Sequence, residues 1–178
     1  MDAITDAYGG DVRMIDGTLV RAHHSAANLK KPPGSLFGRI RVGLTTKIHA
    51  LTDNDGLPVT LVITPGQNHD IQAAAELLKD IHKGQVLLAD RAYDADWLRD
   101  LVFEQGGWAK IPPKSNRTSP ICFSPGLDKQ RSLVEHLFNK LKYYRRLYTL
   151  YDKLGSSFPA MIKLACIRLR LRHYEPTA

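Results

Sequence analysis

The sequence predicts an α/β protein built on a mixed sheet, with three antiparallel strands first and parallel strands after them, flanked by helices. Residues 11–23 alternate β-favouring side chains between two sides, which is typical of a strand. The tripeptide NDG at 54–56 separates two further β-rich runs and favours a hairpin. A helical stretch then precedes the apolar run 86–89, and a strand reached through a helical crossover lies parallel to its neighbour.

Helices are predicted from apolar periodicity and from boundary residues. The predicted helices span 68–82, 94–107, 127–151 and 156–174. Asp94 is expected to cap the second helix, which Gly106 and Gly107 close. After it, residues 108–113 are predicted to form a short strand that two prolines stop.

Composition narrows the class of protein. The 178 residues fit one domain, and a net charge of +7 with a pI of about 9.5 favours polyanionic partners, of which nucleic acid is the commonest. The alternative is a basic protein without such a partner. Cys122 and Cys166 lack C-x-x-C spacing, which argues against a zinc site or a disulfide framework and for a reducing cytoplasm. No signal peptide and no membrane span is predicted.

Three carboxylates lie at the edges of the predicted core. Asp16 lies in the first strand, Asp90 follows the strand 86–89, and Glu135 borders the apolar stripe of the third helix. Converging carboxylates suit hard divalent cations, which take oxygen ligands. Two such ions can hold the attacking and leaving oxygens of a phosphoryl displacement. On a basic protein, this arrangement predicts a phosphoryl-transfer site for nucleic acid.

Each carboxylate also has an ordinary structural interpretation. Asp16 can bond to its neighbouring backbone, and Asp90 can pair with Arg91. Glu135 can pair with Arg131, four residues earlier on the same helix, at a gain of about a few tenths of a kcal/mol. Taken singly, these interpretations are reasonable, so the metal-site hypothesis depends on the three acids meeting.

Four stretches in order carry a family resemblance: MIDGTLVRAH, VITPGQNHDIQAA, LLADRAYDAD and RSLVEHLFNKLK. The last fits a signature of an arginine, three residues, a glutamate, six residues and a lysine, here Arg131, Glu135 and Lys142. Together they resemble the catalytic domain of bacterial insertion-sequence transposases with a DDE triad, in the IS-five group of the IS-four/IS-five superfamily. The resemblance runs from about Met14 to the last helix and implies an RNase H-like fold.

The resemblance also implies roles for individual residues. Asp16, Asp90 and Glu135 would be catalytic and would hold two Mg²⁺ ions, which Mn²⁺ can replace. They would cleave double-stranded DNA at transposon ends and transfer the freed strand to target DNA. Arg131 and Lys142 would lie near the scissile phosphate. Family members act as homo-oligomers on DNA, so this chain is expected to do the same at the bacterial nucleoid.

Aromatic and basic residues alternate directly after the signature. Tyr143, Arg145 and Arg146 follow Lys142, and aromatic rings can stack on unpaired bases. We expect these residues and Arg131 to contact DNA. The alternative is a solvated charged face whose tyrosines pack in the core.

Two departures from the family pattern bear on activity. The signature has a tyrosine three residues before the arginine, where this chain has Asp128. Members often carry an N-terminal region that recognises the element's ends, whereas only 1–13 precedes the expected catalytic domain at 14–174. We expect an active transposase, made alone or joined to an upstream reading-frame product. The alternatives are a partial transposase that binds DNA or dimerises without catalysis, and a stand-alone nuclease.

Overall fold

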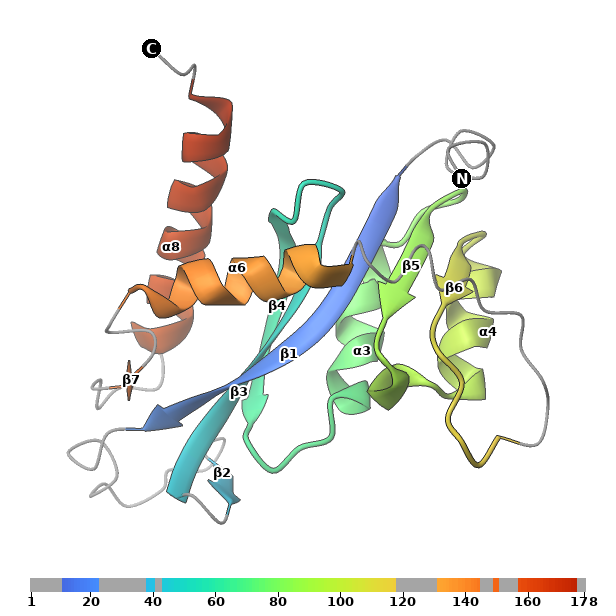
Figure 1. Cartoon of the computed structure of the whole chain (residues 1–178), viewed down its shortest axis with the longest axis horizontal. Helices are drawn as coiled ribbons and strands as arrows, with labels where there is room; N and C mark the ends of the chain where they lie inside the picture. Colours follow the sequence, from blue (N-terminus) through green and yellow to red (C-terminus); the bar gives the residue numbers. More distant parts are fainter. Residues whose placement is uncertain are drawn as a thin grey trace.

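A mixed β-sheet forms the centre of the fold in the computed structural model, which describes residues 11–22, 38–40, 43–117, 131–144, 149–150 and 157–175 (Figure 1). Its strands are β1 (Val12–Ala22), β2 (Gly38–Ile40), β3 (Gly43–Thr52), β4 (Pro58–Pro65), β5 (Val86–Ala89), β6 (Trp108–Lys110) and β7 (Thr149–Leu150). The strand order is β2-β3-β1-β5-β6, while β4 pairs with β3 and β7 with β1.

Strand directions confirm the predicted class. β1, β3 and β4 are antiparallel neighbours, whereas β5 lies parallel to β1 and β6 lies parallel to β5. Three antiparallel strands followed by parallel strands, with helical crossovers between them, are the arrangement of an RNase H-like fold, as expected.

The NDG hairpin joins β3 to β4, as predicted. Asp53 Oδ1 accepts hydrogen bonds from the backbone N–H groups of Asp55 at 3.1 Å and Leu57 at 2.9 Å. Gly56 adopts a φ of +71°, a left-handed conformation that costs glycine little because it has no Cβ. The turn therefore sets the register of the two strands through bonds local to the chain.

Helices cover both faces of the sheet (Figure 1). They are α3 (Ile71–Leu77), α4 (Asp96–Glu104), α6 (Ser132–Lys142) and α8 (Ser157–Tyr174), with short 3-10 turns η1 (Leu78–Asp80) and η2 (Arg91–Tyr93). Buried side chains of α6 and α8 form one core with the sheet, and those of α3 and α4 form another. Within the described part of the chain, no helix is long and apolar enough to cross a membrane.

The side chains of the central strands alternate between these two cores. Met14 of β1 and Leu88 of β5 belong to the core under α6 and α8, whereas Ile15 and Leu87 belong to the core under α3 and α4. Successive side chains of a strand point to opposite faces, so each of these strands is buried on both sides.

Two predicted helices differ in extent from the observed ones. The first ends its α-helical part at Leu77 and continues only as the turn η1. The third ends at Lys142, and its prediction is wrong at Thr149–Leu150, which forms β7 and pairs in parallel with Arg21 and Ala22 of β1. β5 pairs with β1 only from Val12 to Ile15, so the far end of β1 has an edge that another strand can use. Backbone pairing there outweighs the helical pattern of the sequence.

The predicted cap of α4 is also wrong. Ala95 occupies the N-cap position, and its side chain makes no capping hydrogen bond. The carboxylate of Asp94 instead accepts hydrogen bonds from the side chains of Arg99 and Arg117 and from the backbone N–H of Lys114. Bonds from charged donors are stronger than a single bond from a neutral N–H, so they determine the direction of this side chain.

Candidate active site

The pairing of β1 with β5 brings two of the predicted acids together. Ile15 lies opposite Ala89 in this parallel pair, so Asp16 and Asp90 are the next residues along two adjacent strands. Each acid comes two residues after a side chain of the α6 and α8 core, and alternate residues of a strand share one face. Asp16 and Asp90 therefore approach the same face of the sheet, which α6 covers.

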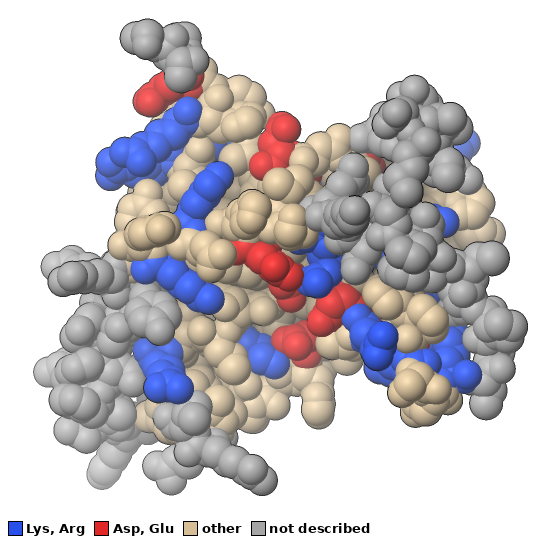
Figure 2. Space-filling view, viewed as in Figure 1, with Lys and Arg blue, Asp and Glu red and all other residues tan. Residues whose placement is uncertain are grey.

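α6 brings the third acid to that face. Its buried side chains pack against the sheet and leave Glu135 at the edge, with 51% of its side chain exposed. Arg131 connects the helix to the strand, because its Nη1 lies 3.1 Å from Glu135 Oε1 and 3.8 Å from Asp16 Oδ2. The i, i+4 pair is thus confirmed, and the same guanidinium also faces the strand acid. Figure 2 shows acidic side chains gathered near the middle of this face, with lysine and arginine side chains around them.

The pKa of Asp16 reflects both its burial and the nearby acids. Burial raises its pKa from 3.8 to about 6, and the negative charges of Asp90 and Glu135 act in the same direction. A hydrogen bond from the Gly17 N–H to Asp16 Oδ1, at 2.7 Å, and the charge of Arg131 oppose this rise. Like charges held together cost free energy unless a cation or a proton compensates them. The site therefore favours binding of a cation.

Asp90 is held by its own turn. Its Oδ1 accepts a hydrogen bond from the Ala92 N–H at 2.8 Å and so caps η2. Within the described segments, no ion pair joins it to Arg91, and the Ala92 bond is the only one to its carboxylate. A carboxylate oriented by one backbone bond keeps most of its acceptor capacity for a ligand.

The donor chemistry of the site fits a hard divalent cation. All three acids offer carboxylate oxygens, which such cations prefer, and bound positive charge would offset the repulsion that raises the pKa of Asp16. In the ranges that the structure describes, no three His, Cys, Asp or Glu side chains are already gathered into a metal cluster. Arg131 lies between Glu135 and Asp16, so the third acid stands apart from a closed ligand set.

A polar cluster around the buried ring of His49, which the sequence did not reveal, lies against Gly17, the neighbour of Asp16. Lys47 Nζ is 2.9 Å from Asp70 Oδ1, and His49 Nδ1 is 3.8 Å from the same oxygen. His49 Nε2 shares a hydrogen bond of 2.8 Å with Thr64 Oγ1. Burial lowers the pKa of His49 to about 4, although the charge of Asp70 opposes this, so the ring is neutral near pH 7.

Gly17 allows this cluster to lie against the strand. A Cβ at this position would be 3.0 Å from His49 Nδ1 and 3.1 Å from Asp70 Oδ1. Gly17 lies directly opposite His49 in the β1–β3 register, whereas Asp70 precedes α3. The stretch VITPGQNHDIQAA contains Asp70, but only the strand pairing shows that it approaches the first catalytic candidate.

Tyr93 lies beside the same acids. Burial raises its pKa far above the ordinary value, and the charges of Asp70, Asp16 and Asp90 add to this rise. Its hydroxyl has no hydrogen-bond partner among the described residues. The phenol is therefore neutral and faces an acidic environment from inside the core.

The predicted DNA-binding residues lie on and after α6. Lys142 is exposed and shares the helix face of Glu135, because seven residues make nearly two turns. Tyr143 is 87% exposed, whereas Tyr144 packs against the core. Outside the described residues lie Arg145, Arg146 and Asp128.

Comparison with known families identifies the family of the chain. A model of the family described as the transposase DDE domain matches residues 7–120, and a second model with the same description matches 87–172. The chain belongs to the transposase DDE domain family. The resemblance inferred from the four sequence stretches is confirmed, and the two matches together include all three acids.

Several bacterial transposases are similar to the chain. It is 37% identical over 130 residues to the transposase assigned to insertion sequence element IS6501 in Brucella ovis, an alignment that covers 72% of this chain and 100% of that protein. It is 26% identical to the transposase assigned to IS402 in Burkholderia cepacia and 29% identical to that of IS1106 in Neisseria meningitidis. These alignments cover 68% and 69% of this chain but only 60% and 45% of those proteins. The similarities support a transposase of the bacterial insertion-sequence type.

One solved structure is similar to part of the chain. The piggyBac transposase, in a synaptic complex with hairpin DNA, matches 61% of this chain and 24% of its own, with 15% identity and a TM-score of 0.41. The fold assignment rests on the strand order described above.

Proposed function

We propose that this transposase cleaves DNA strands and transfers them in a reaction that depends on Mg²⁺, with Asp16, Asp90 and Glu135 as the catalytic carboxylates. The observation that carries the proposal is the parallel register of β1 and β5, which makes Asp16 and Asp90 neighbours beneath α6. The raised pKa of Asp16, caused first by burial and then in part by the charges of Asp90 and Glu135, supports the same grouping.

The proposed metal ligands are these three side chains. Two bound Mg²⁺ ions, or Mn²⁺ in their place, would supply activation of the attacking oxygen and stabilisation of the leaving oxygen. Asp16 and Asp90 are held in place by backbone hydrogen bonds from Gly17 and Ala92. Glu135 would complete the set by turning away from Arg131 toward Asp16. The guanidinium, once released from the carboxylates, could contact a phosphate oxygen.

The chemistry proposed for these residues has two displacements at phosphorus. In the first, water attacks the phosphodiester at a transposon end, and the bond to the 3′ oxygen breaks to leave a free 3′-hydroxyl. In the second, that hydroxyl attacks a phosphodiester of target DNA and displaces another 3′ oxygen. Lys142 and Tyr143 lie on α6 beyond Glu135, where they would contact the backbone near the reacting phosphate, with Arg145 and Arg146 following in sequence.

The proposal extends to partners. Transposon ends and target DNA would be bound by a homo-oligomer at the nucleoid, in the cytoplasm of a bacterium, and the product of an upstream reading frame could add recognition of the ends. We place the catalytic domain at 14–174. The comparisons do not favour the inactive alternative.

Strand cleavage tests the proposal. The purified chain would be incubated with duplex DNA carrying the terminal repeats that flank its gene, in Mg²⁺, in Mn²⁺ or in chelator. We expect metal-dependent nicking at the repeat ends. Asp90→Asn should lower the rate by at least about 100-fold, because even residues that only support metal ligands cost 10–100-fold.

The matched control is Asp100→Asn, which makes the same chemical change at an exposed position on α4. It should cleave at the wild-type rate. Cleavage by Asp90→Asn at that rate would refute the assignment, provided that circular dichroism shows all three proteins folded.

A further inference from the structure

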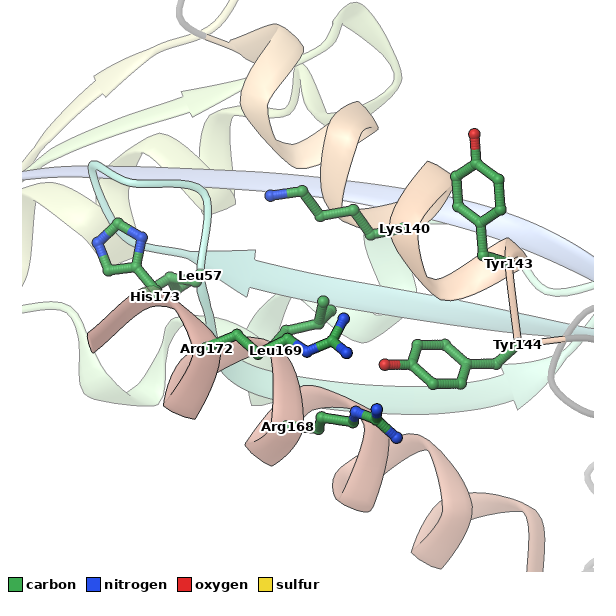
Figure 3. A pocket seen from close by; sticks show the side chains of 8 residues that line it. All are labelled: Leu57, Lys140, Tyr143, Tyr144, Arg168, Leu169, Arg172 and His173. Carbon is green, nitrogen blue, oxygen red and sulfur yellow. The ribbon is translucent and has the colours of Figure 1, made fainter. Parts of the chain in front are cut away.

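A basic groove lies between the end of α6 and the side of α8 (Figure 3). It encloses about 560 Å³. Its lining comes from three segments. Lys140 of α6 and the following Tyr143 and Tyr144 form one side, and Leu57 comes from the β3–β4 turn. The side chains from α8 are Arg168, Leu169, Arg172 and His173. Figure 3 shows Tyr144, just after the end of α6, extending beside the arginine side chains of α8, while Lys140 extends from α6 on the other side of the same space.

The groove cations have no acidic partners within the described part of the chain. No ion pair or hydrogen bond involves the side chain of Lys140, Arg168 or Arg172 there. Arg170 of α8 differs, because its Nη2 lies 2.9 Å from Asp53 Oδ2. His173, which also lines the groove, has its Nε2 3.7 Å from Asp55 Oδ2. The ion pair of Arg170 with the β3–β4 turn thus stabilises the position of α8, while the charges of Lys140, Arg168 and Arg172 face the groove.

Lys140, the groove cation of α6, lies on a different face of that helix from Glu135. Lys142 shares the helix face of Glu135, but Lys140 is turned about 140° from Glu135, since each residue of a helix adds about 100°. The two lysines of α6 therefore serve different surfaces. Arg168 and Arg172 are four residues apart, on one face of α8 and separated by about 6 Å along its axis.

We propose that this groove binds the phosphodiester backbone of duplex DNA beyond the reacting phosphate; the inference rests on the proposed action on DNA. Duplex DNA carries a negative charge about every 1.7 Å along its axis, so cations spaced by one helical turn can contact nearby phosphates. The groove is open, its lining includes the apolar side chains of Leu57 and Leu169, and Lys140, Arg168 and Arg172 contribute three cations without acidic partners among the described residues. This combination suits a continuous polyanion that crosses the surface. Contacts of this kind position DNA without reading its sequence.

Salt-dependent DNA binding tests the proposal. Fluorescence anisotropy would measure binding of a labelled duplex without terminal repeats, in chelator, over a series of chloride concentrations. The groove variant combines Lys140→Gln, Arg168→Gln and Arg172→Gln. Each lost phosphate contact lowers the slope of log affinity against log salt by about 0.9, so we expect a decrease of about 2 to 3.

Two matched variants distinguish the effect of charges in the groove from the effect of total charge on the protein. A control that combines Lys79→Gln, Lys83→Gln and Lys163→Gln removes the same charge at exposed positions outside the groove, and should leave the slope nearly unchanged. A charge-keeping variant, with Lys140→Arg, Arg168→Lys and Arg172→Lys, should retain the wild-type slope. Equal decreases in the groove variant and the control would overturn the proposal, as would no binding by the wild type.

A competition experiment distinguishes the phosphates of DNA from a free phosphate ion as the ligand of the groove. Inorganic phosphate, at ionic strength matched with chloride, should displace no more DNA than chloride does. Stronger displacement by phosphate would indicate a site for a small anion and would overturn the backbone proposal.

The outcomes also separate this inference from the proposed function. A wild type that cleaves DNA, together with a groove variant of unchanged slope, would refute the groove alone. A wild type that binds through the groove but does not cleave with Mg²⁺ or Mn²⁺ would refute the catalytic proposal alone.

Discussion

Asp16 and Asp94 are both removed from solvent, yet their surroundings are opposite. The side chain of Asp94 is 1% exposed, and its carboxylate lies 2.9 Å from Arg99 Nη2, 2.8 Å from Arg117 Nη1 and 2.8 Å from the Lys114 N–H. Burial alone would raise the pKa of Asp94, but these hydrogen bonds together lower it below its ordinary value. The side chain of Asp16 is 19% exposed, and two other acids help to raise its pKa.

Asp94 therefore stabilises the fold, whereas Asp16 is available for a ligand. Asp94 joins the start of α4 to the segment after β6, because its partners lie at 99, 114 and 117. Its acceptor sites are occupied by protein donors. Asp16 has one backbone bond and a distant guanidinium, so its charge is incompletely compensated by the protein. Substitutions at the two positions should therefore have opposite effects on stability.

Asp94→Ala should cause the largest loss of stability. Removing one partner of a buried ion pair leaves uncompensated charge and typically costs about 3 kcal/mol. Urea unfolding would measure the free energy of unfolding. The control Asp100→Ala removes an exposed acid of α4 and should change that free energy by less than about 0.5 kcal/mol. Equal midpoints for the two variants would show that the Asp94 cluster does not stabilise the fold.

Asp16→Asn should increase the free energy of unfolding, but only at pH values at which Asp16 of the wild type is charged. The folded-state pKa of about 6 exceeds the ordinary 3.8, so the folded protein loses stability as pH rises from 3.8 through about 6. The variant lacks this loss, so above pH 6 it should be more stable than the wild type by at most about 3 kcal/mol. Urea unfolding in chelator, below pH 3.8 and above pH 6, measures the difference.

The sign of this pH dependence distinguishes the two acids. The lowered pKa of Asp94 stabilises the fold above pH 3.8, and that contribution is lost as pH falls through the folded-state pKa. The advantage of Asp16→Asn should vanish at low pH. An advantage that stays constant with pH would show that the charge of Asp16, which burial and then the neighbouring acids disfavour, is not its cause.

Tyr93→Phe should have the smallest effect. The hydroxyl is buried without a hydrogen-bond partner among the described residues, so replacing it by hydrogen should change the free energy of unfolding by less than about 1 kcal/mol. Tyr93→Ala is the comparison and should cost about 3–5 kcal/mol, because it leaves a cavity in the core. A loss above about 2 kcal/mol in Tyr93→Phe would contradict an unbonded hydroxyl.

Local patterns in the sequence determined much of this protein. Alternation in β1, the NDG turn and the apolar run of β5 predicted the mixed sheet, since these signals depend on neighbouring residues alone. The spacing of Arg131 and Glu135 on one helical stripe predicted their ion pair, which the structure contains. The four family-like stretches identified the transposase family before any geometry was known.

Only the tertiary structure decided how distant segments meet. The end of β1 extends beyond β5 and pairs with Thr149–Leu150, so a segment with a helical pattern becomes a strand. Asp94 does not cap α4, because its carboxylate accepts a hydrogen bond from Arg117, which is 23 residues away in sequence. His49 and Asp70 approach Asp16 only because β3 pairs with β1 and α3 packs beside them. Charge pairing, burial and strand pairing between distant segments have no local signature, and they determine which acids stabilise the fold and which are left for a ligand.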